Sequence, residues 1–431
     1  MAPARSAAPP RGGFAPTERF LECVHCGLCQ NACPTYLALG AEADSPRGRI
    51  HLMRALQEGR LALDAGAVRH LDLCLGCRGC ETACPSGVAY GELIEAARPW
   101  IEARYRRPLP ERWRRRIVVR ALTRPRLLRA LVTPLRVLDR LGVLRLVRAF
   151  APRVSPGLHL LPASIPPRAV MPPAPAVAAG DARGTPVHLV PGCVMPELCG
   201  DTVRSTARVL AANGWRVTVP AGVGCCGALA LHAGDRAAAL TAARRTLDAL
   251  AAATPTDDGP PIVATAAGCG AMMKGWDDLF ADDPARAAAA ASVARRVRDA
   301  TELLTERPLR DPTSRPSRRV AYHDPCHLAH AQGVRAAPRA LLAAIPGLTL
   351  VPMDDEDLCC GSAGHYNVIQ PAMARTLVAR KVAAIRASGV DLVATANAGC
   401  ALQLAAGLRA AGLAIPVRHV VDLLAEAYDR R

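Results

Sequence analysis

The chain contains two copies of one cysteine pattern, CVHCGLCQNACP at residues 23–34 and CLGCRGCETACP at residues 74–85. In each copy three cysteines recur at every third residue, and a fourth follows immediately before a proline. The first copy consists of Cys23, Cys26, Cys29 and Cys33, and the second of Cys74, Cys77, Cys80 and Cys84. Three thiolates at this spacing can bind one face of a 4Fe-4S cluster, while the proline turns the fourth away. The two stretches therefore predict an N-terminal module built around two clusters.

This spacing is that of bacterial ferredoxins, in which the fourth cysteine binds the other cluster. The ligands are then crossed between the two stretches. The set expected for cluster 1 is Cys23, Cys26, Cys29 and Cys84, and the set expected for cluster 2 is Cys33, Cys74, Cys77 and Cys80. Zinc is the alternative, but zinc ligands usually come as two separated Cys-x2-Cys pairs. The pattern favours 4Fe-4S clusters.

The composition indicates a globular protein in a reducing compartment. A chain of 431 residues with 51% hydrophobic residues is long enough for about three domains with cores of their own. Its 17 cysteines do not indicate secretion, because residues 1–20 contain no apolar segment that would direct export. Metal-binding thiols must stay reduced, so we expect a cytoplasmic protein. No stretch reaches about 18 uncharged apolar residues, so any attachment to the cytoplasmic face of the inner membrane is expected to be peripheral.

The net charge of +17 is concentrated in residues 101–150, which hold fifteen arginines and only three acidic residues. Aromatic residues make up 3% of the chain, too few for the stacking platforms of single-strand binding, so no nucleic-acid partner is expected. This basic helical linker either rests on anionic phospholipid or an acidic partner, or packs as a solvated helix pair on its own protein. Pro125 and Pro134 are expected to break it into short helices.

From Val187 onward the chain repeats itself. Cys193 recurs as Cys326, the doublet Cys225 and Cys226 recurs as Cys359 and Cys360, and Cys269 recurs as Cys400. A lone buried cysteine is usually inert, but four thiols at matched positions in two copies indicate a metal site in each repeat. Four thiols can hold either an iron-sulfur cluster or a zinc ion. Cys199 has no counterpart and is expected to be structural.

Helical and strand-like segments alternate within each repeat, which predicts a parallel sheet with crossover helices. The predicted fold class is α/β, with an N-terminal α-helical two-cluster ferredoxin-like module followed by a duplicated α/β cysteine-rich domain of pseudo-twofold symmetry. Such sheets bind ligands at the carboxyl ends of their strands, where the repeat cysteines fall. The expected segments are the cluster module at 17–100, the basic helical linker at 101–150, a Pro-rich connector at 151–186, and the repeats at 187–310 and 311–431.

Gly222, Gly224 and Gly227 spell a G-x-G-x-x-G sequence. This pattern indicates a dinucleotide site where it follows a strand and opens a helix. The second repeat keeps only the last of these glycines, as Gly361, beside its own cysteine doublet. We therefore attribute the glycines to the doublet and predict no dinucleotide site.

The module and the two repeats together resemble the iron-sulfur subunits of glycolate oxidase. The resemblance extends from about Thr17 to Asp422 and includes the stretches SPRGRIHLMR at 45–54, AYHDPCHLAHAQG at 321–333 and CCGSAGHYN at 359–367. Heterodisulfide reductase subunits are similar too, but each of their repeats ends in Cys-x2-Cys. Met272 and Gln403 occupy the closing position here, and neither side chain binds iron as a thiolate does. Each repeat is therefore left with four thiolates.

The resemblance implies the electron-transfer subunit of a flavin-dependent glycolate dehydrogenase, an oxidoreductase that converts glycolate to glyoxylate with a non-NAD acceptor. FAD is expected on partner glycolate oxidase subunits, because this chain has no flavin-binding fingerprint, and no catalytic residue is assigned to it. Electrons are expected to pass to a membrane quinone. Two alternatives stay open: the corresponding subunit of an anaerobic glycerol-3-phosphate or lactate dehydrogenase, and a non-catalytic metal-binding scaffold filled with zinc.

Five histidines lie close to the cysteines in sequence. They are His25 in the first motif and His323, His327, His330 and His365 in the second repeat. We expect structural hydrogen bonds, and not metal ions, to hold these rings, with Asp324 orienting His323. If a quinone reacts on this chain, it is expected beside the histidines of the second repeat.

Overall fold

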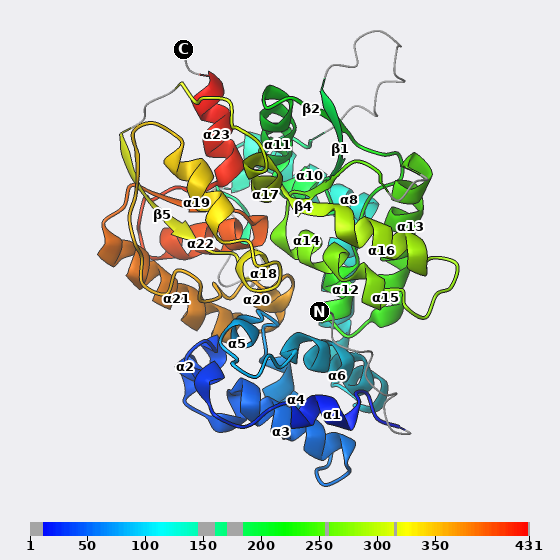
Figure 1. Ribbon diagram of the computed structural model, residues 1–431. Coiled ribbons are helices and arrows are strands. Elements are labelled where there is room, and N and C mark those ends of the chain that lie inside the picture. Colours follow the sequence, from blue (N-terminus) through cyan, green and yellow to red (C-terminus); the bar gives the residue numbers. More distant parts are fainter. Residues whose placement is uncertain (1–11, 145–159, 170–183, 255–257, 314–316, 430–431) are drawn as a thin grey trace.

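The computed structural model describes residues 12–144, 160–169, 184–254, 258–313 and 317–429. Over these residues the chain forms a helical N-terminal module and two α/β units, with the module lying beneath both of them in the view of Figure 1. This is the fold class that the sequence predicts. The end of the basic linker and most of the Pro-rich connector, at residues 145–159 and 170–183, lie outside the described residues.

Short helices form the N-terminal module around a small apolar core. The core includes Phe20, Met53, Leu71 and Ile94, together with Cys74 and Cys80. Helix starts are set locally; at α3, for example, the Ser45 hydroxyl accepts a hydrogen bond from the Gly48 N–H, and Pro46 occupies the first turn. The elements are α1 (Thr17–Leu21), η1 (Leu28–Gln30), α2 (Pro34–Leu39), η2 (Glu42–Asp44), α3 (Pro46–Gln57), α4 (Ala65–Asp72), α5 (Gly79–Thr82) and α6 (Tyr90–Arg104).

The basic linker forms two helices, α7 (Leu109–Thr123) and α8 (Pro125–Arg140). Pro125 starts α8, as expected, but the expectation that Pro134 ends a helix is wrong, because Pro134 lies inside α8. An interior proline costs about 3 kcal/mol. Burial of Leu128 and Val132 against the first repeat offsets this cost, since most helix stability in proteins comes from packing of an apolar face.

The first repeat is a four-stranded parallel sheet with strand order β2-β1-β3-β4. Its strands are β1 (Thr185–Val190), β2 (Trp215–Thr218), β3 (Ile262–Ala264) and β4 (Val297–Asp299). Its helices are α10 (Met195–Leu198), α11 (Gly200–Ala212), α12 (Ala228–His232), α13 (Arg236–Ala253), α14 (Ala267–Lys274), α15 (Trp276–Leu279), α16 (Ala287–Arg296) and α17 (Ala300–Thr305).

The second repeat has the same parallel topology, with strand order β6-β5-β7-β8. Its strands are β5 (Arg318–His323), β6 (Leu348–Leu350), β7 (Leu392–Thr395) and β8 (Val417–His419). Its helices are α18 (Cys326–Ala329), α19 (Ala336–Ala343), α20 (Tyr366–Ile369), α21 (Pro371–Ser388), α22 (Ala398–Ala410) and α23 (Val420–Asp429).

The strand register matches the two sheets residue by residue. The central strands β1 and β5 have the same length, and each lies between two parallel neighbours. The last residue of β1, Val190, pairs with Ala264, and the last residue of β5, His323, pairs with Thr395. Val190 and His323 are therefore equivalent positions, each just before the first cysteine of its repeat.

The two repeats pack on one another around a shared core. Residues of both sheets, such as Leu189 and Tyr322, belong to the same buried hydrophobic cluster. The contacts are reciprocal, since α11 of the first repeat packs on α23 of the second, and α19 of the second packs on α17 of the first. Equivalent helices of the two repeats thus make equivalent contacts, which is the pseudo-twofold symmetry that the sequence predicts. None of the helices within the described ranges is both long and apolar enough to span a lipid bilayer.

Candidate functional site

The thiols expected for cluster 2 surround one cavity. Its lining includes Cys33 from the first motif together with Cys74, Cys77 and Cys80 from the second. Burial raises the pKa of Cys80, and the thiols of Cys77, Cys74 and Cys33 raise it further. Four cysteine thiols around a common cavity are the donor set that a 4Fe-4S cluster requires, so these residues fit such a cluster. The crossed assignment of Cys33 stays a prediction, and the geometry is compatible with it.

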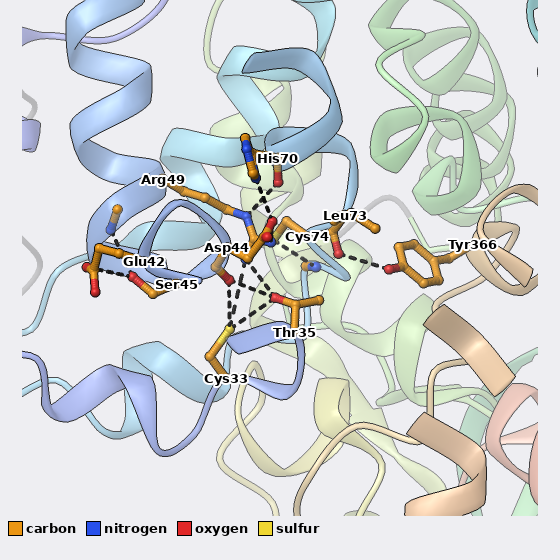
Figure 2. A network of polar contacts seen from close by, with 12 residues as sticks. Cys33, Thr35, Glu42, Asp44, Ser45, Arg49, His70, Leu73, Cys74 and Tyr366 are labelled. Atoms are coloured by element: carbon orange, nitrogen blue, oxygen red, sulfur yellow. Dashed lines mark hydrogen bonds and ion pairs between the residues drawn. The ribbon is translucent and has the colours of Figure 1, made fainter. Parts of the chain in front are cut away.

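A buried polar network holds the Cys33 side of this cavity (Figure 2). Arg49, which is only 1% exposed, places its Nη1 3.9 Å from Cys33 Sγ and 3.0 Å from Thr35 Oγ1. Its charge is compensated by Asp44, whose Oδ1 lies 3.4 Å from Arg49 Nη2 and 2.9 Å from His70 Nδ1. A fully buried cation beside a cysteine sulfur stabilises negative charge there. Arg49 belongs to the stretch SPRGRIHLMR, but no spacing or pattern in the sequence predicts that it lies beside Cys33.

The Cys74 side of the cavity is held by two donors. The Gly76 N–H and the Tyr90 hydroxyl each donate to Cys74 Sγ at 3.4 Å. Gly76 has a positive φ of 67°, a conformation that glycine adopts without strain and that lets its N–H approach the sulfur. Hydrogen bonds to sulfur tune the potential of iron-sulfur clusters. Tyr90 lies outside the cysteine motifs, and spacing alone did not point to it.

The thiols expected for cluster 1 lie nearer the surface. Cys23, Cys29 and Cys84 pack at the edge of the module core, while Cys26 is exposed. Burial raises the pKa of Cys29, and the neighbouring Cys23 and Cys33 thiols add to this rise. The structure thus places Cys23 and Cys29 close together, and the ligand role of all four thiols stays a prediction.

In the first repeat the four thiols gather into one group, named a thiol row after the order of their contacts; Cys193 and Cys269 at its two ends also lie close enough to interact. Cys225 contacts the thiols of Cys193 and Cys226, and Cys226 in turn contacts Cys269. The contacts with Cys193 and Cys226 lower the pKa of Cys225, as does the Gly227 N–H, which donates to Cys225 Sγ at 3.4 Å. Three segments that are distant in sequence therefore deliver thiols to one place.

The second repeat contains a row in the same order. Cys326 Sγ lies 4.0 Å from Cys359 Sγ, Cys359 contacts Cys360, and Cys360 contacts Cys400. The equivalents of a closing cysteine do not join either row: Met272 is buried in an apolar cluster, and Gln403 Oε1 accepts a hydrogen bond from Asn367 Nδ2 at 3.0 Å. Each row is thus compatible with a four-thiolate site, and the ligand role of these cysteines stays a prediction.

The cluster 2 cavity abuts the row of the second repeat. Burial raises the pKa of Cys77, and the nearby Cys326 thiol raises it further. The Cys77 thiol in turn adds to the raised pKa of Cys359, after the larger effects of hydrogen bonding and burial. Tyr366 at the start of α20 donates to the Leu73 carbonyl at 2.9 Å, beside Cys74 (Figure 2). The thiols of the module and of the second repeat therefore form a nearly continuous line.

Two histidines join the module to the repeats. A ring nitrogen of His327 lies 3.0 Å from the Gly76 carbonyl, and His330 Nδ1 lies 2.9 Å from Thr82 Oγ1. The His327 ring also packs edge-on against His232 of the first repeat, with centroids 5.3 Å apart. These contacts agree with the structural roles expected for His327 and His330.

The expectation is wrong for His323. Neither of its ring nitrogens makes a hydrogen bond of ordinary geometry to the described residues, and its buried ring instead lies beside Cys360 and Cys400. Asp324 does not orient His323, because its carboxylate forms a two-pronged ion pair with Arg339 at 2.9 and 2.7 Å. Charge neutralisation by a nearby arginine outweighed proximity in sequence.

Protein-family models match the N-terminal module and both repeats. A 4Fe-4S dicluster domain matches residues 19–88, and a cysteine-rich domain matches residues 187–274 and again residues 320–405. The chain is thus an iron-sulfur protein with a duplicated cysteine-rich domain.

Full-length relatives define the family within this class. The chain is 36% identical to the glycolate oxidase iron-sulfur subunit of Escherichia coli (strain K12), over 95% of this chain and 94% of the relative. It is 34% identical to the probable glycolate oxidase iron-sulfur subunit of Bacillus subtilis (strain 168), over the same shares. Lactate utilization protein A of Shouchella clausii (strain KSM-K16) is 30% identical over 51% of this chain and 90% of its own length. The chain belongs to the family of glycolate oxidase iron-sulfur subunits.

Proposed function

We propose that this chain is the electron-transfer subunit of a flavin-dependent glycolate dehydrogenase. The observation that carries the proposal is the line of thiols from the cluster 2 cavity to the second repeat, in a chain that matches glycolate oxidase iron-sulfur subunits over nearly its whole length. Removal of a hydride from glycolate requires a flavin or nicotinamide, which we assign to FAD on partner subunits. Two 4Fe-4S clusters bound in the module would carry the electrons onward singly.

Charged and hydrogen-bonding residues around the expected cluster 2 site favour electron transfer through it. Arg49 places a buried positive charge beside Cys33, and the Gly76 and Tyr90 donors stabilise negative charge on Cys74. Such charge and hydrogen bonds favour the reduced state of a cluster. Leu73, Leu75 and Tyr366 pack in one buried cluster with Cys359 of the second repeat. The path inside the module would therefore lead toward the second repeat.

We further propose that helices α7 and α8 attach the subunit to an anionic membrane, where a quinone accepts the electrons. One face of the pair packs on the protein, through Val119, Leu128 and Val132. The other face of α7 exposes a stripe of apolar side chains, Leu109, Trp113 and Ile117, which are 66%, 56% and 60% exposed. Arginines flank this stripe. The inward face thus packs on the protein itself. We assign the outward face to anionic phospholipid, because apolar residues flanked by arginine are typical of peripheral membrane helices.

The proposal is tested by replacing Cys29 with serine in the complex with its flavoprotein partners, purified without oxygen. We expect the variant to lose glycolate-dependent dye reduction, because cluster 1 loses a ligand. Cys199→Ser is the matched control, since Cys199 packs against the shared core and should leave activity unchanged. Full activity of Cys29→Ser, or a wild-type protein that contains zinc and no reducible iron, contradicts the electron-transfer role.

The substrate is tested with the same complex. Lactate is the second candidate because a lactate utilization protein matches about half of this chain. Faster dye reduction with lactate or glycerol 3-phosphate than with glycolate would reassign the substrate while leaving the electron-transfer role intact.

A further inference from the structure

Three buried donor atoms converge in the second repeat. One ring nitrogen of His323 and the Sγ atoms of Cys360 and Cys400 all lie within 4.8 Å of one another. The three residues are 1%, 1% and 3% exposed. Donors bound to one tetrahedral metal ion lie at about 2.0 to 2.3 Å from it, so a small inward movement would allow all three to bind the same ion.

The surroundings of His323 fit a metal ligand better than a packed side chain. A buried imidazole without hydrogen bonds of good geometry loses its hydration without compensation. Its polar neighbours besides the two thiols include the Glu356 carbonyl and the ammonium group of Lys381. Metal-binding histidines usually direct their second ring nitrogen at a carboxylate or backbone carbonyl, and the Glu356 carbonyl is placed for this role.

The first repeat lacks this donor. Val190 occupies the position equivalent to His323 at the end of the central strand. The four cysteines are common to both repeats, so the imidazole is what distinguishes the second thiol row from the first.

The two repeats also differ at a buried position on the long helix that follows the cysteine doublet. Gly227 and Gly361 make the same close approach to the next long helix, so that Ala239 on α13 corresponds to Ala374 on α21. Seven residues further along these helices, the first repeat has Thr246 and the second has Lys381. Lys381 is 1% exposed and donates to the Asp355 carbonyl, and its charge acts on the Cys359 and Cys360 thiols. A buried ammonium group is costly unless it neutralises negative charge, and thiolates bound to a metal carry such charge.

We propose that the second repeat holds a transition-metal centre with mixed imidazole and thiolate ligation, in which His323, Cys360 and Cys400 bind the metal and Lys381 neutralises its thiolates. Cys359 and Cys326 continue the thiol row toward Cys77. The first repeat, with Val190 and Thr246, does not form a centre of this kind. Iron and zinc both accept nitrogen and sulfur donors, and the experiment distinguishes them.

The test compares metal content and ligand identity in full-length protein purified without oxygen. His323→Val introduces the residue of the first repeat, and we expect it to lose the second-repeat metal. His323→Cys supplies a thiolate in place of the imidazole, and we expect it to keep the metal. His188→Val is the matched control: His188 is a buried histidine on β1 whose ring nitrogens lie 2.8 Å from Thr218 and Thr254 hydroxyls, and its loss should leave every metal in place.

Ligand identity is read by spectroscopy on the wild type. If the metal is zinc, X-ray absorption at the zinc edge should show a nitrogen neighbour at about 2.0 to 2.1 Å among sulfurs at about 2.3 Å. If it is iron, pulsed electron paramagnetic resonance of the reduced protein should show coupling to histidine nitrogen that changes on ¹⁵N-histidine labelling. Either nitrogen signature should be absent from His323→Cys.

Absence of both nitrogen signatures in the wild type overturns the proposal, as does full metal retention by His323→Val. If the valine variant does not fold, the wild-type spectra and the cysteine variant still decide. The all-cysteine clusters expected in the module give separate reduced-cluster signals, so failure of this proposal is distinguishable from failure of the electron-transfer role.

Discussion

Replacing Arg49 with methionine should shift the reduction potential of cluster 2 to more negative values. Arg49 Nη1 lies 3.9 Å from Cys33 Sγ inside the protein. At an effective dielectric constant of about 20, a unit charge at this distance contributes about 4 kcal/mol, which for one electron corresponds to about 180 mV. The added electron is spread over a cluster beyond the sulfur, so we expect a shift of about 50 to 100 mV.

The assay is a potentiometric titration of the anaerobically purified protein, followed by electron paramagnetic resonance. Arg49→Lys keeps the charge and should stay close to the wild-type potential, and Arg54→Met removes a partly exposed arginine of α3 that pairs with Glu58 as a control. A positive shift in Arg49→Met, or a shift equal in the lysine and methionine variants, refutes the electrostatic reasoning.

Replacement of Arg49 should also lower the stability of the protein. Loss of Arg49 leaves Asp44 buried with His70 as its remaining partner, and breaking a buried ion pair costs about 3 to 5 kcal/mol. If Arg49→Met is therefore recovered without its clusters, Asp44→Asn provides the test, because it removes the negative charge that lies next to Arg49 and leaves the positive charge in place. Removal of the carboxylate should raise the potential of cluster 2, and a lowered potential would count against the argument.

Three further predictions concern the surfaces that join the parts. Trp113→Glu on α7 should weaken binding to anionic vesicles by more than tenfold in sedimentation assays, whereas equal binding to neutral vesicles or none by the wild type would exclude the membrane surface. Tyr366→Phe should destabilise docking of the module by about 1 kcal/mol in urea unfolding, because the Leu73 carbonyl loses its donor; an unchanged midpoint contradicts this. Burial raises the pKa of Glu95, but its contact with His232 outweighs burial and lowers the pKa to about 2. The stabilisation is complete above the unfolded pKa and is lost as the pH falls toward 2, so about 1 kcal/mol should disappear between pH 6 and pH 4, and Glu95→Gln should remove that dependence in thermal unfolding.

The local sequence was sufficient for the cysteine motifs and for the repeat. The predictions used three local properties: cysteines at every third residue, a proline after the fourth cysteine, and alternation of strands and helices. Few structures are compatible with each of these patterns, so a short segment is enough to recognise them. The parallel sheets and the reciprocal packing of the repeats followed from these patterns. The error at Pro134 has a physical reason, because local propensity weighs less than burial of Leu128 and Val132 against residues distant in sequence.

The partners of individual side chains could not be read in this way. Asp324 stands next to His323 in the chain, yet it pairs with Arg339, and His323 lies instead beside Cys360 and Cys400. Arg49 and Lys381 show no periodicity or spacing that would reveal their burial beside thiols. Their environments depend on which helices pack together.

Residue order and type therefore determined the two cysteine motifs and the duplicated cysteine-rich domain, since cysteine spacing and sequence repetition are properties of the linear chain. Only the folded chain decided that the second motif faces the second repeat, across contacts such as Tyr366 to Leu73, and that an imidazole joins only one of the two thiol rows among the described residues. Such contacts join residues hundreds of positions apart. They depend on how whole domains pack together, and no single segment of the sequence contains that information.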